Sequence, residues 1–211
     1  MSILVATPAY GGNITLPHFH SCLALKEEFQ AANIEHAWLT TANESLITRA
    51  RNTMMSTFYK DTEFEYLLFL DADIEFRPDD VHKLWMLASD CDVAVGAYPM
   101  KRLDAPLSAW REGKLVTIEG ETEPFEVDFA GTGFMLIKRK LIHDMIQVFK
   151  ALEHEEGHIG RCWALFDTMI WNDTYLSEDY AFCHRARSIG AKIMCDPTIN
   201  LIHHGQFAYG A

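Results

Sequence analysis

The sequence predicts an α/β protein with a mostly parallel central sheet flanked by helices and a smaller antiparallel portion in its second half. Over the first hundred residues, short apolar segments alternate with helical patterns, an order typical of parallel sheets. One apolar segment of strand length, residues 66–70, ends abruptly in Asp-Ala-Asp. In the second half, residues 107–118 place Glu-Gly-Lys between two extended stretches, which indicates a hairpin.

The elements of the first half follow from their local patterns. Buried parallel strands form short continuous apolar runs, which we expect at residues 3–6, 35–39, 66–70 and 92–97. Apolar spacing and a proline suited to a first helical turn predict helices at residues 16–32, at residues 45–59 and from Pro78. Residues 7–12 contain two glycines and are expected to form a loop that approaches a ligand closely.

The second half is predicted with less regular structure. Residues 126–138 contain Gly-Thr-Gly followed by the apolar residues 134–137. Helices are expected at residues 139–152 and from Ser177, and a last strand at residues 192–202. Residues 153–171 are rich in His, Gly and aromatic residues and are expected to form an irregular lid. Neither a repeat nor a linker interrupts the chain, so residues 1–211 are expected to form a single domain.

The composition excludes several classes of partner. A net charge of -12 argues against nucleic acid and anionic membranes, although a metal and a local arginine can still hold one small anionic ligand. The five cysteines are odd in number and form no CxxC pair, which favours a reducing compartment, the cytoplasm. We expect no signal peptide and no membrane span, since no apolar stretch approaches about 20 residues.

The two acids after residues 66–70 are the strongest candidates for a ligand site. In an extended chain Asp71 and Asp73 would point to the same side, about 7 Å apart. Ligands collect outside the carboxyl ends of parallel strands, so the pair could share one divalent cation or divide a cation and a sugar hydroxyl. The alternative is a pair of solvated loop acids.

Two positions near the end of the chain also suit chemistry. Asp179 follows Ser177 and Glu178 and is either a general base or a plain acid in the first turn of a helix that Ser177 caps. His203, favoured over His204, follows a predicted strand and could complete a cation site. Because imidazole is a softer ligand than Mg²⁺ usually takes, an Asp/His set favours Mn²⁺, with Mg²⁺ as the alternative.

Arg51 is expected to point inward, because Ile47, Met54 and Phe58 lie on its face of the predicted helix. A buried guanidinium needs a partner, either a carboxylate or a diphosphate. Arg49 lies on another face and is expected to be solvated.

Six motifs in order resemble glycosyltransferases of the GT-A (Rossmann-like) fold and span nearly the whole chain. They are Thr7-Pro8-Ala9-Tyr10, Ala50-Arg51-Asn52, Leu70-Asp71-Ala72-Asp73, Gly131-Thr132-Gly133-Phe134, Ser177-Glu178-Asp179 and His203-His204-Gly205. The resemblance implies a nucleotide-binding half at about residues 1–100 and an acceptor and metal half at about residues 101–211. The chain is also similar to the amino-terminal glycosyltransferase domain of a large algal DNA virus protein, which implies a module of a longer chain in host cytoplasm.

The resemblance also implies roles for the matched positions. Asp179 would be the catalytic base, and the metal ligands would be Asp73, Asp71 and His203. The donor would contact Thr7, Pro8, Ala9, Tyr10, Arg51, Asp71, Ala72, Asp73, Gly131, Thr132 and Gly133. Residues 153–173 match no pattern of the family, so the acceptor is not indicated.

The function that this resemblance implies is metal-dependent transfer of a sugar from a nucleotide-diphosphate donor to a glycan or other hydroxyl acceptor. A UDP-sugar is the donor expected from the family, and a GDP-sugar is the alternative, since no residue distinguishes uridine from guanosine. Inversion is expected if Asp179 activates the acceptor, and retention if it lies away from the anomeric carbon. Two alternatives are a non-catalytic nucleotide-sugar or glycan binder and a phosphohydrolase of the haloacid dehalogenase type. The phosphohydrolase pattern fits less well, because Glu75 stands where that pattern has Thr or Val.

Overall fold

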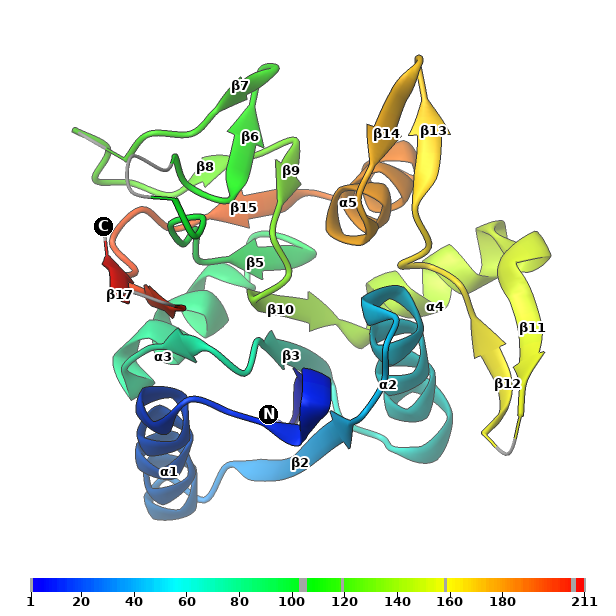
Figure 1. The fold of residues 1–211 in the computed structure, drawn as a ribbon. Helices are drawn as coiled ribbons and strands as arrows, with labels where there is room; N and C mark the ends of the chain where they lie inside the picture. The colour runs from blue at the N-terminus through cyan, green and yellow to red at the C-terminus, as the bar shows by residue number, and fades with distance from the viewer. Residues whose placement is uncertain (1, 103–105, 119, 158, 206–207, 211) are drawn as a thin grey trace.

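A computed structural model describes residues 2–102, 106–118, 120–157, 159–205 and 208–210. Its centre is a seven-stranded sheet with helices on both faces (Figure 1). Five strands run in one direction, while β10 and β8 run the opposite way. The strands, in their order across the sheet, are β2 (Glu35–Ala42), β1 (Ser2–Ala9), β3 (Tyr66–Leu70), β10 (Phe134–Lys138), β5 (Val93–Val95), β15 (Ile193–Cys195) and β8 (Phe125–Glu126).

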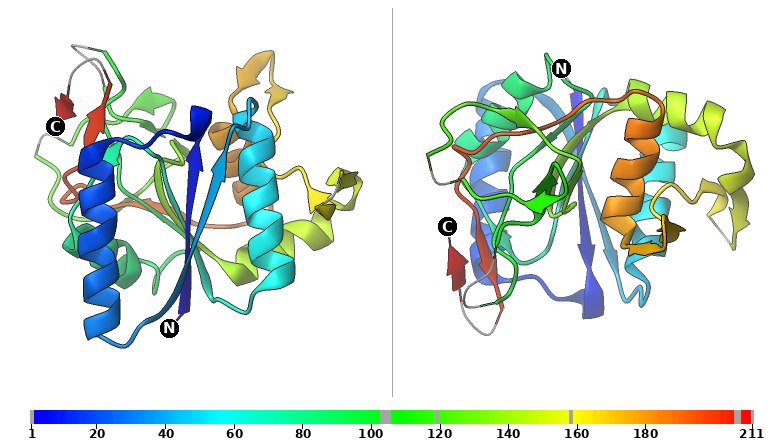
Figure 2. Two further views of the ribbon diagram at one scale, coloured as in Figure 1. Left: turned by 60° about the horizontal axis from the view of Figure 1, so that its bottom comes forward. Right: turned by 90° about the horizontal axis from the view of Figure 1, so that it is seen from above.

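The helices form two layers around this sheet (Figure 2). One face is covered by α1 (Leu16–Ala31) and α3 (Pro78–Leu87), which pack with Leu25, Phe29 and Leu84 into one core. The other face is covered by α2, α4 and α5, and its core contains the stacked rings of Phe166 and Phe182. The bounds of these elements and of two short 3-10 helices are α2 (Ile47–Asp61), α4 (Arg139–Val148), α5 (Glu178–Ser188), η1 (Tyr10–Gly12) and η2 (Lys150–Leu152). The α/β class predicted from the sequence is confirmed.

Small antiparallel sheets surround the central one, as expected for the second half of the chain. The predicted hairpin at residues 107–118 is present as β6 and β7. The strands of these sheets are β4 (Ile74–Glu75), β6 (Ala109–Arg111), β7 (Lys114–Leu115), β9 (Phe129–Ala130), β11 (Glu153–Glu156), β12 (Gly160–Trp163), β13 (Met169–Trp171), β14 (Thr174–Leu176), β16 (Ile202–His204) and β17 (Ala208–Gly210).

The prediction of an irregular lid at residues 153–171 was wrong, because this segment contains the hairpin β11–β12 and continues into the hairpin β13–β14. In the second hairpin Trp171 pairs with Thr174, which leaves a two-residue loop. Asn172 and Asp173 in that loop both have positive φ, 47° and 60°. Two consecutive residues with positive φ form a turn whose twist matches the right-handed twist of the flanking strands. The Asn-Asp pair in the sequence therefore indicated a hairpin.

The prediction of a single strand at residues 192–202 was also wrong, because this segment contributes to two strands, β15 and β16, which belong to different sheets. Pro197 lies between them and has no N–H to donate to a ladder. The Asp196 carboxylate accepts hydrogen bonds from the N–H and the hydroxyl of Thr198, which forms a local turn. The expected loop at residues 7–12 begins later than predicted, since β1 continues to Ala9.

The fold brings distant segments to one edge of the sheet. The parallel strands β1 and β3 are neighbours, so their carboxyl ends meet at the same edge. The chain turns after β3 into β4, and β16 pairs with β4 so that His203 lies opposite Ile74. This pairing places a residue near the end of the chain beside Asp73.

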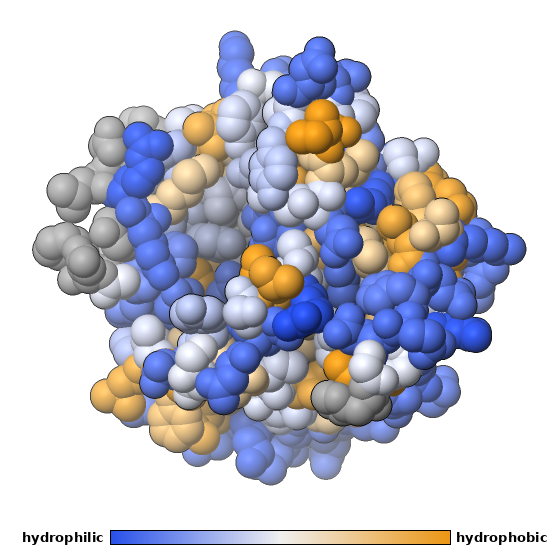
Figure 3. Space-filling model, turned by 45° about the vertical axis from the view of Figure 1, so that its right-hand side comes forward, coloured by the Kyte–Doolittle hydropathy of each residue, from blue (hydrophilic) through white to orange (hydrophobic). Residues whose placement is uncertain are grey.

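The surface agrees with the strongly charged composition. On the face shown in Figure 3, hydrophilic side chains predominate and hydrophobic ones lie in small separate groups. Of the helices in the described part of the chain, none is both long and apolar enough to cross a membrane.

Arg139, the first residue of α4, connects this helix to the end of α2. Its guanidinium donates to the carbonyls of Phe58, Tyr59, Thr62 and Phe64, at 2.6–3.0 Å. These carbonyls lie in the last turn of α2 and just beyond it, where a helix leaves its acceptors unpaired. The same group lies 4.3 Å from the centre of the Phe58 ring.

Arg139→Ala is expected to lower the free energy of unfolding by about 2–4 kcal/mol, because four partly buried backbone carbonyls lose a charged donor. Urea denaturation followed by circular dichroism measures the change. Lys140→Ala is the matched control, since Lys140 contacts Asp144 at the surface and its loss should change stability by under about 0.5 kcal/mol. Equal effects of the two substitutions would contradict the role given to Arg139.

Candidate active site

A pocket of about 600 Å³ opens at the carboxyl ends of β1 and β3. Its walls come from the end of β1, the start of α1, the turn after β3, the first turns of α2 and α5, and β16. Seven of the positions predicted from the sequence line it, namely Pro8, Tyr10, Arg51, Asp71, Ala72, Asp73 and His203. Segments separated by more than a hundred residues therefore meet where a parallel sheet is expected to bind its ligand.

The Asp-Ala-Asp motif forms a turn rather than a continuation of the strand. The N–H of Ile74 donates to the carbonyl of Asp71 at 3.1 Å. The carbonyl of Ala72 accepts from the N–H of Thr15, and that of Asp73 accepts from the N–H of His204. The expectation that an extended chain aligns the two aspartates was therefore wrong, although both line the same pocket.

Arg51 is buried, with 3% of its surface exposed, and bridges two carboxylates. Its Nη2 lies 2.9 Å from Oδ1 of Asp71, and its Nε lies 3.5 Å from Oε1 of Glu178. Burial lowers the pKa of Arg51, but the charges of Asp71 and Glu178 outweigh it and raise that pKa above its usual value. The buried Nη1 has no hydrogen-bond partner among the described residues. Arg49 instead pairs with Glu44 at the surface.

Asp73 faces the side chains of a lysine and a histidine at once. Nζ of Lys101 lies against its Oδ2, and Nε2 of His203 lies 3.4 Å from its Oδ1. Burial raises the pKa of Asp73, but the hydrogen bonds and charges of His203 and Lys101 outweigh it and lower that pKa to about 2. Asp73 is therefore a carboxylate throughout the physiological range.

The two histidines of β16 point to different partners. Nδ1 of His203 lies 2.9 Å from the carbonyl oxygen of Pro99, which can only accept, so Nδ1 carries the proton. In the neutral ring the lone pair of Nε2 then faces Asp73, an arrangement typical of metal-ligating histidines. His204 instead places Nε2 2.6 Å from Glu75. Of the two, His203 is the one suited to a cation beside Asp73.

Asp179 lies at the start of α5 but does not line the pocket, whereas its neighbour Glu178 does. Its Oδ1 accepts from the hydroxyl of Ser177 and, at 2.8 Å, from the N–H of Tyr180. Ser177 thus occupies the capping position without capping the helix through its side chain. Burial and the charge of Glu178 raise the pKa of Asp179 to about 6.

The segment from Gly131 to Gly133 packs behind the pocket, against Tyr98. A Cβ on Gly133 would lie 2.8 Å from Cζ of Tyr98 and 2.9 Å from Oδ2 of Asp71, and one on Gly131 would clash with the Tyr98 hydroxyl. The Gly133 N–H donates to that hydroxyl at 3.1 Å. Thr132 is buried, and its hydroxyl has no partner among the described residues. The Tyr98 side chain leaves no room for a Cβ at residues 131 and 133, which explains both glycines. The sequence pattern did not indicate this role of Tyr98.

Thr7 and Ala9, the other two positions expected at the nucleotide, are buried within β1 and do not line the pocket. Pro8 and Tyr10 do line it, and the Tyr10 ring is 79% exposed. Lys101 lines the pocket and was missed by sequence reasoning, because nothing in its neighbourhood marks it as facing an acid.

The residues present fit a divalent cation that is shared with a substrate. No cluster of three or more His, Cys, Asp or Glu side chains with metal-binding geometry occurs in the described residues. Asp73 and His203 supply two donors close together, and Asp71 lies in the same pocket while holding Arg51. Cations of this kind are often held by one or two protein ligands plus substrate phosphates.

The fold and this site define a class, the GT-A glycosyltransferases. The profile of glycosyl transferase family 2 matches residues 38–146, which is half of the chain, and the chain belongs to that family. A comparison with curated protein sequences finds no match.

Two solved structures show the same fold at low sequence identity, and a third is similar over a comparable length. A197 from STIV has a TM-score of 0.64 and 20% identity, over 97% of this chain and 86% of that chain. GalNAc-T7, whose structure was solved with UDP, GalNAc and Mn²⁺, has a TM-score of 0.57 and 14% identity, over 95% of this chain and 42% of that chain. The catalytic domain of Drosophila β1,4-galactosyltransferase 7, in complex with xylobiose, has a TM-score of 0.49 and 12% identity, over 94% and 66% of the two chains.

Glu178→Gln is expected to lower the pKa of Asp179 from about 6 towards its ordinary value, because the like charge beside it disappears. A carboxyl-carbon NMR titration measures this pKa directly. Glu27→Gln removes the same charge from an exposed position on α1 and should leave the titration of Asp179 unchanged. An Asp179 pKa that stays near 6 in Glu178→Gln would contradict the effect assigned to the like charge.

Proposed function

We propose that the protein transfers a sugar from a nucleotide-diphosphate donor, a UDP-sugar, to a hydroxyl group of a glycan or other acceptor, with a divalent metal and with inversion. The observation that carries this proposal is the juxtaposition of the Asp73–His203 pair and the Asp71–Arg51 pair in one pocket of a family 2 chain. The phosphohydrolase alternative loses its support, because the chain belongs to a glycosyltransferase family.

Asp73 and His203 would hold the metal, with Asp71 as the third ligand. The imidazole favours Mn²⁺ over Mg²⁺. When bound, the metal would act as a Lewis acid that neutralises the charge developing on the departing diphosphate. The similar fold of GalNAc-T7, solved with UDP and Mn²⁺, supports this choice of nucleotide and ion.

The donor would lie along the pocket wall, with its base against Pro8 and Tyr10. Arg51 lines the pocket and would present its positive charge to the diphosphate or ribose, and Asp71 and Ala72 would contact the donor at the turn. Thr7 and Ala9, buried in β1, and the Gly131, Thr132 and Gly133 segment behind Asp71 would shape the pocket rather than touch the nucleotide.

Asp179 would accept the proton of the acceptor hydroxyl as its oxygen attacks the anomeric carbon. The bond from that carbon to the diphosphate oxygen breaks in the same displacement, which inverts the centre. With a pKa of about 6, Asp179 is mostly ionised at neutral pH and still a stronger base than an ordinary aspartate.

We also propose a reducing compartment, the cytoplasm, for this protein. All five cysteines are free, and four of them are buried. Burial raises the pKa of Cys22, Cys183 and Cys195 to about 12, which keeps these thiols protonated and unreactive.

Calorimetric titration with UDP, with GDP as comparator, tests the donor site. We expect Mn²⁺-dependent binding of UDP, and Asp73→Asn should weaken it because a charged metal ligand is lost. Asp179→Asn should bind UDP like the native chain but lose at least about a hundredfold in turnover of a transferred sugar. The native rate should fall as the pH drops through about 6, where Asp179 becomes protonated. Absence of nucleotide binding with Mn²⁺ would reject the proposal.

Lys101→Met should raise the affinity for Mn²⁺ in the absence of nucleotide by about two- to fivefold, because the ammonium group no longer competes for Asp73. Electron paramagnetic resonance of free Mn²⁺ measures this affinity without turnover. Lys101→Arg keeps the charge and should bind Mn²⁺ like the native chain. Weaker Mn²⁺ binding by Lys101→Met would show that the lysine supports the site instead of competing for it.

A further inference from the structure

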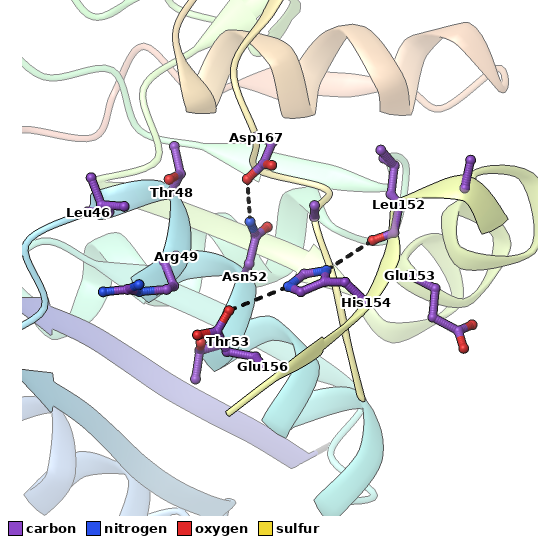
Figure 4. A pocket seen from close by; sticks show the side chains of 12 residues that line it. Leu46, Thr48, Arg49, Asn52, Thr53, Leu152, Glu153, His154, Glu156 and Asp167 are labelled. Carbon is purple, nitrogen blue, oxygen red and sulfur yellow. Dashed lines mark hydrogen bonds and ion pairs between the residues drawn. The ribbon is translucent and has the colours of Figure 1, made fainter. Parts of the chain in front are cut away.

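A second pocket, of about 440 Å³, lies between α2 and the hairpin β11–β12, and we call it the α2–β11 pocket (Figure 4). One wall is formed by the first turns of α2, with Thr48, Asn52 and Thr53. The opposite wall is β11 and the segment that follows β12, with His154, Glu156 and Asp167. We propose that this pocket binds a neutral saccharide, as part of the glycosyl acceptor; the inference rests on the proposed glycosyltransferase function.

Hydrogen bonds connect the two walls of the pocket to each other and to the residues behind them. Asn52 is 4% exposed, and its amide group donates to Oδ1 of Asp167 and accepts from the N–H of Phe166, both at 2.8 Å. One turn further along α2, the hydroxyl oxygen of Ser56 accepts from the N–H of Trp163 at 3.1 Å. Arg185 donates to the carbonyl of Asp167 at 2.7 Å. The wall is thus held in place before any ligand arrives, which lowers the entropy lost on binding.

The lining chemistry suits hydroxyl groups. Sugar hydroxyls both donate and accept, and the pocket offers carboxylates, hydroxyls and an imidazole together with the apolar side chains of Leu46, Leu152 and Ala164. The His154 ring is oriented by the carbonyl of Leu152 at 3.2 Å, so that Nε2 faces Glu156 at 3.8 Å (Figure 4).

The charges favour a neutral ligand over an ionic one. Three carboxylates line the pocket, and the guanidinium of Arg49 already makes two hydrogen bonds to Glu44, at 2.7 Å each, which disfavours an anion. A cation is disfavoured as well, because each carboxylate has a partner: Asp167 bonds to Asn52, Glu153 pairs with Arg161, and Glu156 faces His154.

The α2–β11 pocket and the donor pocket are both lined by residues from the first turns of α2. Arg51 lines the donor pocket, and the next residue, Asn52, lines the α2–β11 pocket. Their partners are also neighbours, because the pairing of Met169 with Leu176 brings the segment before β13, with Asp167, beside the start of α5, with Glu178. An acceptor of more than one sugar can therefore place its reacting end near Asp179 and a further residue in the α2–β11 pocket.

The two walls have different origins in the sequence. The α2 wall lies within residues 38–146, which match the family, whereas the β11 wall lies beyond that range. A pocket with one wall outside the matched region is suited to distinguish acceptors while the donor chemistry stays the same.

The test titrates the full chain with neutral di- and trisaccharides of glucose, galactose, mannose, xylose and N-acetylglucosamine, followed by saturation-transfer NMR and by the shift of the Asn52 side-chain amide. We expect one group of these sugars to bind and to move the Asn52 signal. Glu156→Ala and His154→Ala should each weaken that binding at least about tenfold, because hydrogen bonds to charged or polarised partners are lost. Neither substitution should change Mn²⁺-dependent UDP binding.

Glu155→Ala is the matched control. Glu155 is the neighbour of both residues on β11, but it lies on the opposite side of the strand and does not line the pocket, so its loss should leave saccharide binding unchanged. The inference is overturned if no saccharide of the panel binds to a chain that binds UDP, or if Glu156→Ala and Glu155→Ala bind alike. Saccharide binding at this pocket without any UDP binding would instead reject the proposed transferase function and leave a glycan-binding module.

Discussion

The buried ion pair network of Arg51 is the interaction on which the candidate site depends. The guanidinium joins α2 to the turn after β3 through Asp71 and to the start of α5 through Glu178. A buried charge is tolerated only while its partners compensate it, so these three segments hold one relative position or the core becomes unstable. One network therefore positions the acids around the proposed metal, the helix that carries Asp179, and the Asn52 side of the neighbouring pocket.

Much of the fold could be predicted because buried strands and amphipathic helices have distinct patterns. The apolar residues of β3 and the helices that flank it are examples. The wrong predictions for residues 153–171 and 192–202 arose from turn chemistry rather than from hydrophobicity. Asn172 and Asp173 form a tight hairpin loop, and Pro197 with the Asp196 turn interrupts a stretch that is apolar enough to be one strand.

The part of the site that could be predicted is the part whose charged residues have a recognisable position in the sequence, either directly after a buried strand or on an apolar helix face. Asp71, Asp73 and Arg51 were found because charged side chains directly after a buried strand, or on an apolar helix face, need an ion-pair partner or a ligand to offset their burial. Tyr98 and Lys101 were not found, because their roles depend on which distant residues the fold brings to them. The exposure of Phe19 and Leu23 shows the same limit, since helical spacing alone does not tell which face of α1 meets the sheet.

The position of β10 between β3 and β5 has a consequence for synthesis of the chain. During translation β1, β2 and β3 can pair as soon as they emerge, but the second edge of β3 has no partner until residues 134–138 follow. Until then the ribosome-bound chain presents the strand Leu-Leu-Phe-Leu with an open, apolar edge, the kind of surface through which nascent chains aggregate. The antiparallel strand β10 thus covers an edge of β3 that stays open until the second half of the chain has been synthesised.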